Sequence, residues 1–327
     1  MLSRLVTFAA ATLVLTACGG GQTPTSPSPP PQPGALRITC PSGAVASTTG
    51  TTAAVTFPAP TTTGGVAPVT VTCSPFSGSP FPIGTTTVAC QATDARSTAA
   101  ACSFLVVVSR IPTLRLTRFL AFGDSITAGE VTVPVPTAAG APAWGLQILV
   151  PPASYPTQLE SLLRGRYLSQ ASAISVVNAG LSGEQAVDGA RRFPDIMAST
   201  RPEAVLLLAG YNDLTTFGMA GVSRAVSAMD TMAREARVRG ARVFLASLTP
   251  SRPGGRNTIP PAVIDEFNAR LRTLASGEGA VFVDLHRALL PSVPTYIGVD
   301  GLHPTEAGYR RMAEEFLLSI RTTLETP

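Results

Sequence analysis

Two patterns of apolar residues divide the chain near residue 110. Residues 35–110 contain short runs rich in Thr and Val, separated by clusters of Pro, Gly and Ser. From residue 115 onward, continuous apolar runs alternate with segments in which apolar residues recur every three or four positions. Short strands between turns predict a small β-sandwich, whereas the alternation predicts strands of a parallel sheet joined by helices. The pattern therefore predicts two domains, at 35–110 and 115–327.

The second region carries five candidate strands and four amphipathic helices. The strands are expected at 119–122, 174–177, 204–209, 242–246 and 280–283. The helices are expected around 159–163, 222–236, 263–274 and 312–320. Each strand run is largely apolar, which is typical of a parallel sheet covered on both faces. We expect an α/β fold with a five-stranded, parallel, doubly wound sheet.

The first 34 residues have the character of an export signal followed by a spacer. Residues 1–17 contain one basic residue, Arg4, and an apolar core that is too short to span a membrane. They lead into Leu15-Thr16-Ala17-Cys18, which resembles a bacterial lipobox and implies lipidation of Cys18. The alternative is an ordinary signal peptide that leaves Cys18 as a free thiol. Residues 18–34 are rich in Gly, Pro, Ser and Thr, and we expect a tether.

This reading predicts an exported bacterial lipoprotein, anchored to a membrane in the periplasm or at the cell surface. The four cysteines other than Cys18 are confined to the predicted sandwich: Cys40, Cys73, Cys90 and Cys102. Outside the cytoplasm, these cysteines are expected to form two disulfides, and three pairings remain open. A metal site fits less well, because the region has no histidine and no Cys-x-x-Cys spacing.

The run from Cys73 to Asp94 resembles the hyalin-repeat (HYR) family. That resemblance implies an Ig-like sandwich of a kind found in extracellular proteins, where it serves adhesion or spacing. A carbohydrate or protein ligand for this domain is compatible with that role. The segment has no histidine and a single acidic residue, Asp94, so no catalytic group is expected there.

Charge excludes one class of partner. The formal net charge is +4 with only 13% charged residues, about half the usual ~25%. The chain has no lysine and no long basic run, so nucleic-acid binding is not indicated. Arg191 and Arg192 are expected to lie on a solvated helix face.

Candidate chemistry begins directly after the first strand of the second region. Gly123-Asp124-Ser125 places a serine just past the carboxyl end of that strand, where open α/β sheets bind ligands. A capping turn is the alternative. Near the other end of the chain, Asp300 and His303 offer a carboxylate and an imidazole three residues apart. The order Ser, Asp, His is one of the known orders for a catalytic triad. The other histidine, His286, is expected to be structural, as is Asp284.

Two further strand ends could donate hydrogen bonds to a tetrahedral oxyanion. Gly180 follows the strand at 174–177, and its N–H could approach a ligand closely. Asn212 follows the strand at 204–209 and would supply a side-chain amide. The alternative for each is an ordinary Gly/Asn turn.

An apolar insert at 131–152 follows the Ser125 loop. It is rich in Pro and Ala, has no charged residue, and contains the single tryptophan, Trp144. It could be a surface loop that packs its own apolar residues. It could instead be a flap that supplies an apolar wall for an acyl chain.

Together these blocks resemble the SGNH/GDSL hydrolase family of esterases and lipases, which has a flavodoxin-like fold. Gly123-Asp124-Ser125-Ile126-Thr127, Gly180, Gly210-Tyr211-Asn212-Asp213 and Asp300-Gly301-Leu302-His303-Pro304 match its four blocks. The resemblance implies Ser125 as nucleophile, His303 as general base and Asp300 as its orienting group. It also implies an oxyanion hole made by the N–H groups of Ser125 and Gly180 and the side chain of Asn212.

The resemblance implies no metal and no cofactor. It points to a small-molecule or lipid ester as substrate, in the manner of lysophospholipases or arylesterases. Carbohydrate O-acetyl ester hydrolysis is the alternative within the family. A hypothesis of another class is an extracellular binding or adhesion protein that works through its HYR domain.

Overall fold

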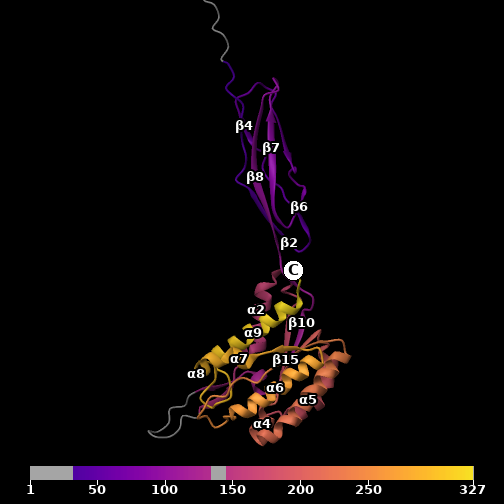
Figure 1. Ribbon diagram of the computed structural model, residues 1–327, viewed down its shortest axis with the longest axis vertical. Helices are drawn as coiled ribbons and strands as arrows, with labels where there is room; N and C mark the ends of the chain where they lie inside the picture. The colour runs from indigo at the N-terminus through magenta and orange to yellow at the C-terminus, as the bar shows by residue number, and fades with distance from the viewer. Residues whose placement is uncertain (1–31, 134–144, 327) are drawn as a thin grey trace, which may run out of the picture. The chain divides into compact units, whose positions relative to one another are not determined.

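The structure is a computed structural model that describes residues 32–133 and 145–326 (Figure 1). The predictions for the signal peptide, for lipidation of Cys18 and for Trp144 lie outside the described residues. Two compact units are formed. One includes Thr56–Ser79 and Thr87–Leu105, and the other includes Ala44–Val55, Pro80–Thr86 and the α/β region. Within the described ranges, none of the helices combines the length and apolar character needed to cross a bilayer.

The N-terminal region is built of strands, as predicted for an Ig-like domain. A four-stranded sheet has the order β2-β8-β7-β5, and the pairs β1-β4 and β3-β6 form two smaller sheets. Alternate residues of β7 and β8 are buried, including Val88, Ala92, Phe104 and Val106. The strands are β1 (Arg37–Thr39), β2 (Ala44–Thr48), β3 (Thr52–Ala54), β4 (Thr61–Thr63), β5 (Thr70–Ser74), β6 (Pro80–Pro82), β7 (Gly84–Thr93) and β8 (Ala99–Arg110).

Two disulfides join the four cysteines of this region and settle the open pairing. One joins Cys40 to Cys102, and the other joins Cys73 to Cys90. Cys73 and Cys90 lie directly opposite each other on the antiparallel strands β5 and β7. The first bridge closes a span of 62 residues, so by chain entropy it constrains the unfolded state more than the second bridge does.

The second region contains the five-stranded parallel sheet that the apolar runs predict. Its order is β13-β10-β14-β15-β16, and each neighbouring pair is parallel. The strands are β10 (Arg118–Gly123), β13 (Ser175–Gly180), β14 (Ala204–Leu208), β15 (Arg242–Ala246) and β16 (Val281–Val283). The chain leaves β10 for one neighbour, β13, and then crosses to the other neighbour, β14. This switch in direction opens a ligand crevice at the carboxyl ends of these strands.

Helices cover both faces of the sheet (Figure 1). α5 and α6 lie on one side, while α2 and α9 pack against each other on the other side. The long helices are α2 (Tyr155–Arg166), α3 (Ala186–Thr200), α5 (Met219–Val238), α6 (Pro261–Gly277) and α9 (Glu306–Leu324). Of these long helices, α3 was not predicted from the spacing of apolar residues, because its buried face includes Gly189 and the helix contains Pro194.

Shorter elements complete the α/β region and include those that carry the candidate site. They are α1 (Ser125–Ala128), α4 (Tyr211–Phe217), α7 (Leu285–Leu289), α8 (Val293–Tyr296), β9 (Thr113–Leu114), β11 (Glu130–Val133), β12 (Leu146–Leu149) and β17 (Glu325–Thr326). β11 and β12 form an antiparallel hairpin at the two ends of the apolar insert, and residues 134–144 between them lie outside the described part.

Candidate active site

Ser125 begins α1, separated by one residue from the end of β10, which lies between β13 and β14 in the sheet. The Asp124 side chain caps this helix by accepting the Ile126 N–H at 3.1 Å. Gly123 leaves no room for a side chain, because a Cβ there would lie 2.0 Å from the carbonyl oxygen of Leu208. The tight passage from strand to helix therefore requires glycine and holds Ser125 at the carboxyl edge of the sheet.

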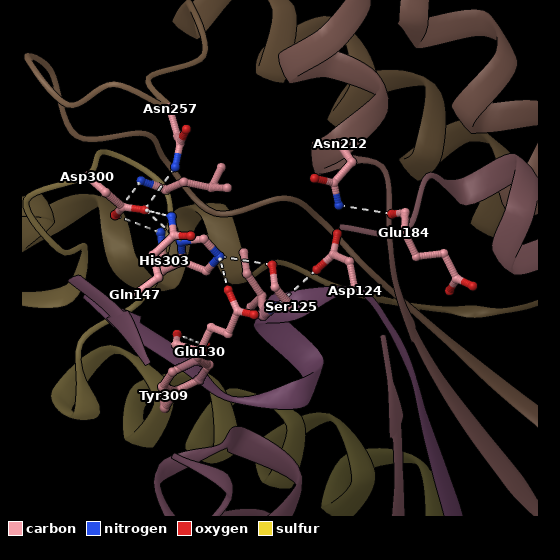
Figure 2. Close-up of polar contacts among 12 residues, drawn as sticks. Asp124, Ser125, Glu130, Gln147, Glu184, Asn212, Asn257, Asp300, His303 and Tyr309 are labelled. Atoms are coloured by element: carbon pink, nitrogen blue, oxygen red, sulfur yellow. Dashed lines mark hydrogen bonds and ion pairs between the residues drawn. The ribbon is translucent and has the colours of Figure 1, made fainter. Parts of the chain in front are cut away.

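His303 and Asp300 come from the segment before α9 and meet Ser125 there (Figure 2). Ser125 Oγ lies 2.9 Å from His303 Nε2, and His303 Nδ1 lies 2.6 Å from Asp300 Oδ2. All three side chains are nearly inaccessible to solvent. The structure thus brings together the three residues that the sequence nominated, across a separation of 178 residues.

Asp300 is held as a carboxylate by the donors around it. Its Oδ1 accepts the N–H groups of Leu302 and His303. Its Oδ2 accepts the amides of Asn257 at 3.1 Å and Gln147 at 3.2 Å, besides the contact with His303. Burial alone would raise the pKa of Asp300, but the hydrogen bonds and the charge of His303 outweigh it and hold the pKa well below its usual range.

Asn257 and Gln147 were not found by sequence reasoning. Asn257 lies in the loop between β15 and α6, and Gln147 lies on β12 of the hairpin. Neither residue is part of a sequence motif that could have marked it. The described part of the insert therefore turns a polar side chain toward Asp300, whereas Leu146, Ile148 and Leu149 are exposed.

Asn212 lies on the other side of Ser125, on the first turn of α4. Its Nδ2 donates one hydrogen bond to the carbonyl oxygen of Glu184 at 2.9 Å (Figure 2). An amide nitrogen carries two hydrogens, so this bond orients the side chain and leaves the second hydrogen for a ligand.

Gly180 does not have the place predicted for it. Its N–H donates to Asn178 Oδ1 at 3.0 Å, and it is absent from the lining of the cavity beside Ser125. A Cβ at Gly180 would lie 2.1 Å from the backbone nitrogen of Ala128, so close packing against α1 explains the glycine. The structure does not support Gly180 as an oxyanion donor.

Gly183 is the glycine that lines the cavity together with Ser125 and Asn212. Its φ of +76° lies in the left-handed region that favours glycine. The signal in the sequence was a second glycine three residues after Gly180, beyond the end of β13. Sequence reasoning stopped at the first glycine because it continues directly from the strand.

An ion pair supports the loop that carries Gly183. Arg192 donates to both carboxylate oxygens of Glu184, at 2.6 and 2.7 Å, and to the carbonyl oxygen of Ala179 at 2.8 Å. Its guanidinium also lies 4.1 Å from the centre of the Phe122 ring. The expectation of a solvated Arg192 was therefore wrong, whereas Arg191 is exposed as predicted.

The cavity beside Ser125 has a volume of about 400 Å³. Hydroxyl, amide and charged side chains line most of it, including Glu130, Gln147, Thr215 and Arg256. A larger hollow of about 560 Å³ lies at the opposite, amino-terminal edge of the sheet near Arg118, where no nucleophile meets a base. Within residues 32–133 and 145–326, no cluster of His, Cys, Asp and Glu could hold a metal ion.

Comparison with known proteins identifies this arrangement. Residues 121–311, more than half of the chain, match the profile of the GDSL-like lipase/acylhydrolase family. The chain belongs to this family. It is therefore an ester-hydrolysing enzyme. Residues 31–108 match the HYR domain, and this domain and the two disulfides indicate an extracellular protein.

Relatives within the GDSL family include esterase TesA of Pseudomonas aeruginosa. TesA is 28% identical over 167 residues, which cover 50% of this chain and 78% of TesA. A crystal structure of TesA is similar over 62% of this chain and 98% of its own length, with 26% identity and a TM-score of 0.47. Axe2, an acetylxylan esterase from Geobacillus stearothermophilus, is similar over 62% and 94%, with 21% identity and a TM-score of 0.48.

A second carboxyl group of this GDSL-family site, that of Asp124, is fully buried beside the serine. Its Oδ2 has no hydrogen-bond partner among the described residues. Burial, together with the negative charges of Asp213 and Glu184, raises the pKa of Asp124 to about 7. The hydrogen bond from Ile126 and the charge of His303 oppose this rise but do not cancel it.

We expect Asp124 to make folding stability fall between about pH 4 and pH 7. Across that window the unfolded chain loses this proton near its ordinary pKa, while the folded chain keeps it, so the unfolded state binds fewer protons and stability falls as pH rises. The free energy of unfolding should drop by up to about 4 kcal/mol from this group. Urea titrations of the wild type and of Asp124→Asn at pH 4.5, 6 and 8 would measure the effect.

Asp124→Asn keeps an oxygen that can cap α1 but does not titrate. Its stability should therefore change less than that of the wild type across the window. Parallel stability curves for the two proteins would contradict the assignment of this pH dependence to Asp124.

Proposed function

We propose that this GDSL-family protein is an exported serine esterase that cleaves carboxylic esters through an acyl-enzyme. Ser125 is the nucleophile, His303 the general base and Asp300 the group that orients the imidazole. One observation carries the proposal: the unbroken contact from Ser125 Oγ through His303 to the Asp300 carboxylate, at 2.9 and 2.6 Å.

This contact supports an assignment of the protons. Asp300 is a carboxylate and only accepts hydrogen bonds, so Nδ1 of neutral His303 carries the hydrogen and Nε2 is free to accept one. Nε2 takes the proton of Ser125 Oγ as the oxygen attacks the ester carbonyl, and then delivers it to the leaving alcohol. Water, activated by the same imidazole, attacks the acyl-enzyme and releases the acid.

The tetrahedral oxyanion needs donors that are already oriented. In our proposal these are the N–H groups of Ser125 and Gly183 and the second hydrogen of Asn212 Nδ2. The bond from Asn212 to Glu184 supports this role because it removes the amide's rotational freedom before the substrate binds.

Two classes of ester are candidate substrates, and they differ in both the acyl group and the alcohol. The first comprises lysophospholipid or aryl esters, and the second comprises carbohydrate O-acetyl esters. The polar walls and the volume of about 400 Å³ favour a short acyl group and a polar alcohol over a long acyl chain. We also propose a membrane anchor through Cys18 and a carbohydrate or protein ligand for the HYR domain.

A fluorophosphonate probe tests the proposed activity directly. We expect the purified wild-type protein to be labelled, and peptide mapping by mass spectrometry to place the label on Ser125. A folded wild-type protein that remains unlabelled would favour a binding or adhesion function instead. A panel of p-nitrophenyl esters, lysophospholipids and acetylated sugars would then assign the substrate class.

Asn212→Ala should lower kcat for p-nitrophenyl acetate by about 10²- to 10³-fold, because one preoriented oxyanion donor is lost. KM should change much less, since the donor acts mainly on the charge that forms in the transition state. Steady-state kinetics of the variant and the wild type would give both values. A loss of kcat below threefold would remove Asn212 from the oxyanion hole.

A further inference from the structure

A second carboxylate, besides that of Asp300, contacts the catalytic imidazole and is not used in the proposed acyl transfer. Glu130 Oε2 lies 3.4 Å from His303 Nε2, the nitrogen that also contacts Ser125 Oγ (Figure 2). Only 18% of the Glu130 side chain is exposed. Among the described residues, its carboxylate pairs with no arginine, and its one such contact is with His303, which is neutral before the reaction begins in the proposed mechanism. A largely buried carboxylate without a permanent cation is costly, so this negative charge is available to a cationic ligand.

The hairpin explains how Glu130 reaches this position. In the β11–β12 register Thr132 faces Gln147, and residues two apart on a strand share a face. Glu130 and Gln147 therefore project from the same face of the hairpin, and both contact the Asp300–His303 pair. The Tyr309 hydroxyl donates to the backbone oxygen of Glu130 at 2.6 Å and ties β11 to α9.

Glu130 lies near the place that the alcohol half of the ester would occupy. The leaving alcohol must lie within hydrogen-bond distance of His303 Nε2 to receive its proton. Its oxygen then lies no more than about 6 Å from Glu130 Oε2, given the two contacts that Nε2 makes. Asn212 lies on the opposite side of the Ser125–His303 contact (Figure 2), so Glu130 faces the alcohol rather than the oxyanion.

We infer that Glu130 is a specificity residue that selects esters whose alcohol carries a positive charge close to the ester oxygen. This inference rests on the proposed serine esterase function and names the alcohol class for that same site. A cationic nitrogen two carbons from the ester oxygen would come near the carboxylate and compensate its charge. An alcohol with a negative charge at that position would be repelled.

Other charges near the cavity do not reverse this preference. Asp300 is also negative, so its charge favours a cationic alcohol rather than opposing one. Arg256 also lines the cavity, but it is exposed, and solvent screens an exposed charge more strongly than a buried one.

Acetylcholine and 3,3-dimethylbutyl acetate make a matched pair of probes. They share the acyl group and the shape of the alcohol, and differ only in the positive charge. We expect wild-type kcat/KM to be about tenfold higher for acetylcholine, because the attraction between two charges about 5 Å apart exceeds the cost of removing the cation from water. In Glu130→Gln the ratio of the two kcat/KM values should fall to within about twofold of one. Glu314→Gln removes the same charge from α9, away from the cavity, and should keep the wild-type ratio.

The ratio separates a specificity role from a general effect on catalysis. An equal loss on both esters in Glu130→Gln, with the ratio unchanged, would overturn the inference. So would a wild-type ratio near one while both esters are hydrolysed.

As a second measurement, choline should inhibit p-nitrophenyl acetate hydrolysis more strongly than 3,3-dimethylbutanol in the wild type only. Equal inhibition by the two alcohols in the wild type would also overturn it. No hydrolysis of any of the three esters would reject the proposed esterase function and the inference with it.

Discussion

Ser125→Ala is expected to lower kcat for p-nitrophenyl acetate by at least about 10⁴-fold, because the acyl-enzyme cannot form without the hydroxyl. Folding should be preserved. The cap of α1 comes from Asp124, and Ser125 Oγ contributes one hydrogen bond, to His303. Steady-state kinetics would measure the loss of activity, and thermal melting would measure the stability of the variant.

Ser199→Ala is a suitable control for this variant. Ser199 is exposed on α3, and among the described residues its hydroxyl bonds only to its own helix, at Ile196. Its removal should leave kcat within about twofold of the wild type, as for most exposed positions away from a site. Retention of more than a hundredth of the activity in a folded Ser125→Ala protein would mean that another residue is the nucleophile.

Asp300→Asn is expected to have the second largest effect, a loss of about 10³- to 10⁴-fold in kcat. An amide at this position can present its NH₂ group to His303, and the imidazole then favours the tautomer whose Nε2 carries the hydrogen. That nitrogen could no longer accept the proton of Ser125. The loss should appear in kcat at pH 7 to 8, and the far-ultraviolet circular dichroism of the variant should match that of the wild type.

Asp284→Asn provides a matched comparison for Asp300→Asn. Asp284 also precedes a histidine, His286, but it caps α7 and pairs with Arg272 at 2.6 Å. Asparagine retains the capping oxygen, so activity should remain within about threefold of the wild type. An equal loss in the two variants would show that Asp300 supports the fold rather than the orientation of His303.

The parallel sheet could be predicted from the chain because each of its strands is a short apolar run bounded by polar residues. All five runs became neighbouring strands of one sheet. α3 could not be predicted in this way, since Gly189 and Pro194 interrupt its apolar period while the turn of the helix still buries Phe193 and Met197. Tertiary packing overrode a weak local pattern there.

Ser125, Asp300, His303 and Asn212 could be nominated because each lies at a strand end or before the last helix, in a block that resembles a known family. Gly180 shows the limit of this reasoning. A glycine in a motif can serve either a ligand or close packing, and only the contacts of its backbone decide which. At Gly180 they are the Asn178 side chain and the backbone of α1.

The sequence alone thus predicts the strands, the nucleophile and its base, because apolar runs and short motifs are local properties. The sequence alone does not predict the disulfide pairing or the ion pair of Arg192 with Glu184. Nor does it predict that the polar groups of Glu130, Gln147 and Asn257 reach the site. Each of these depends on which side chains from different segments the fold brings into direct contact. These contacts are set by the packing of the whole domain, and no spacing within one segment encodes them.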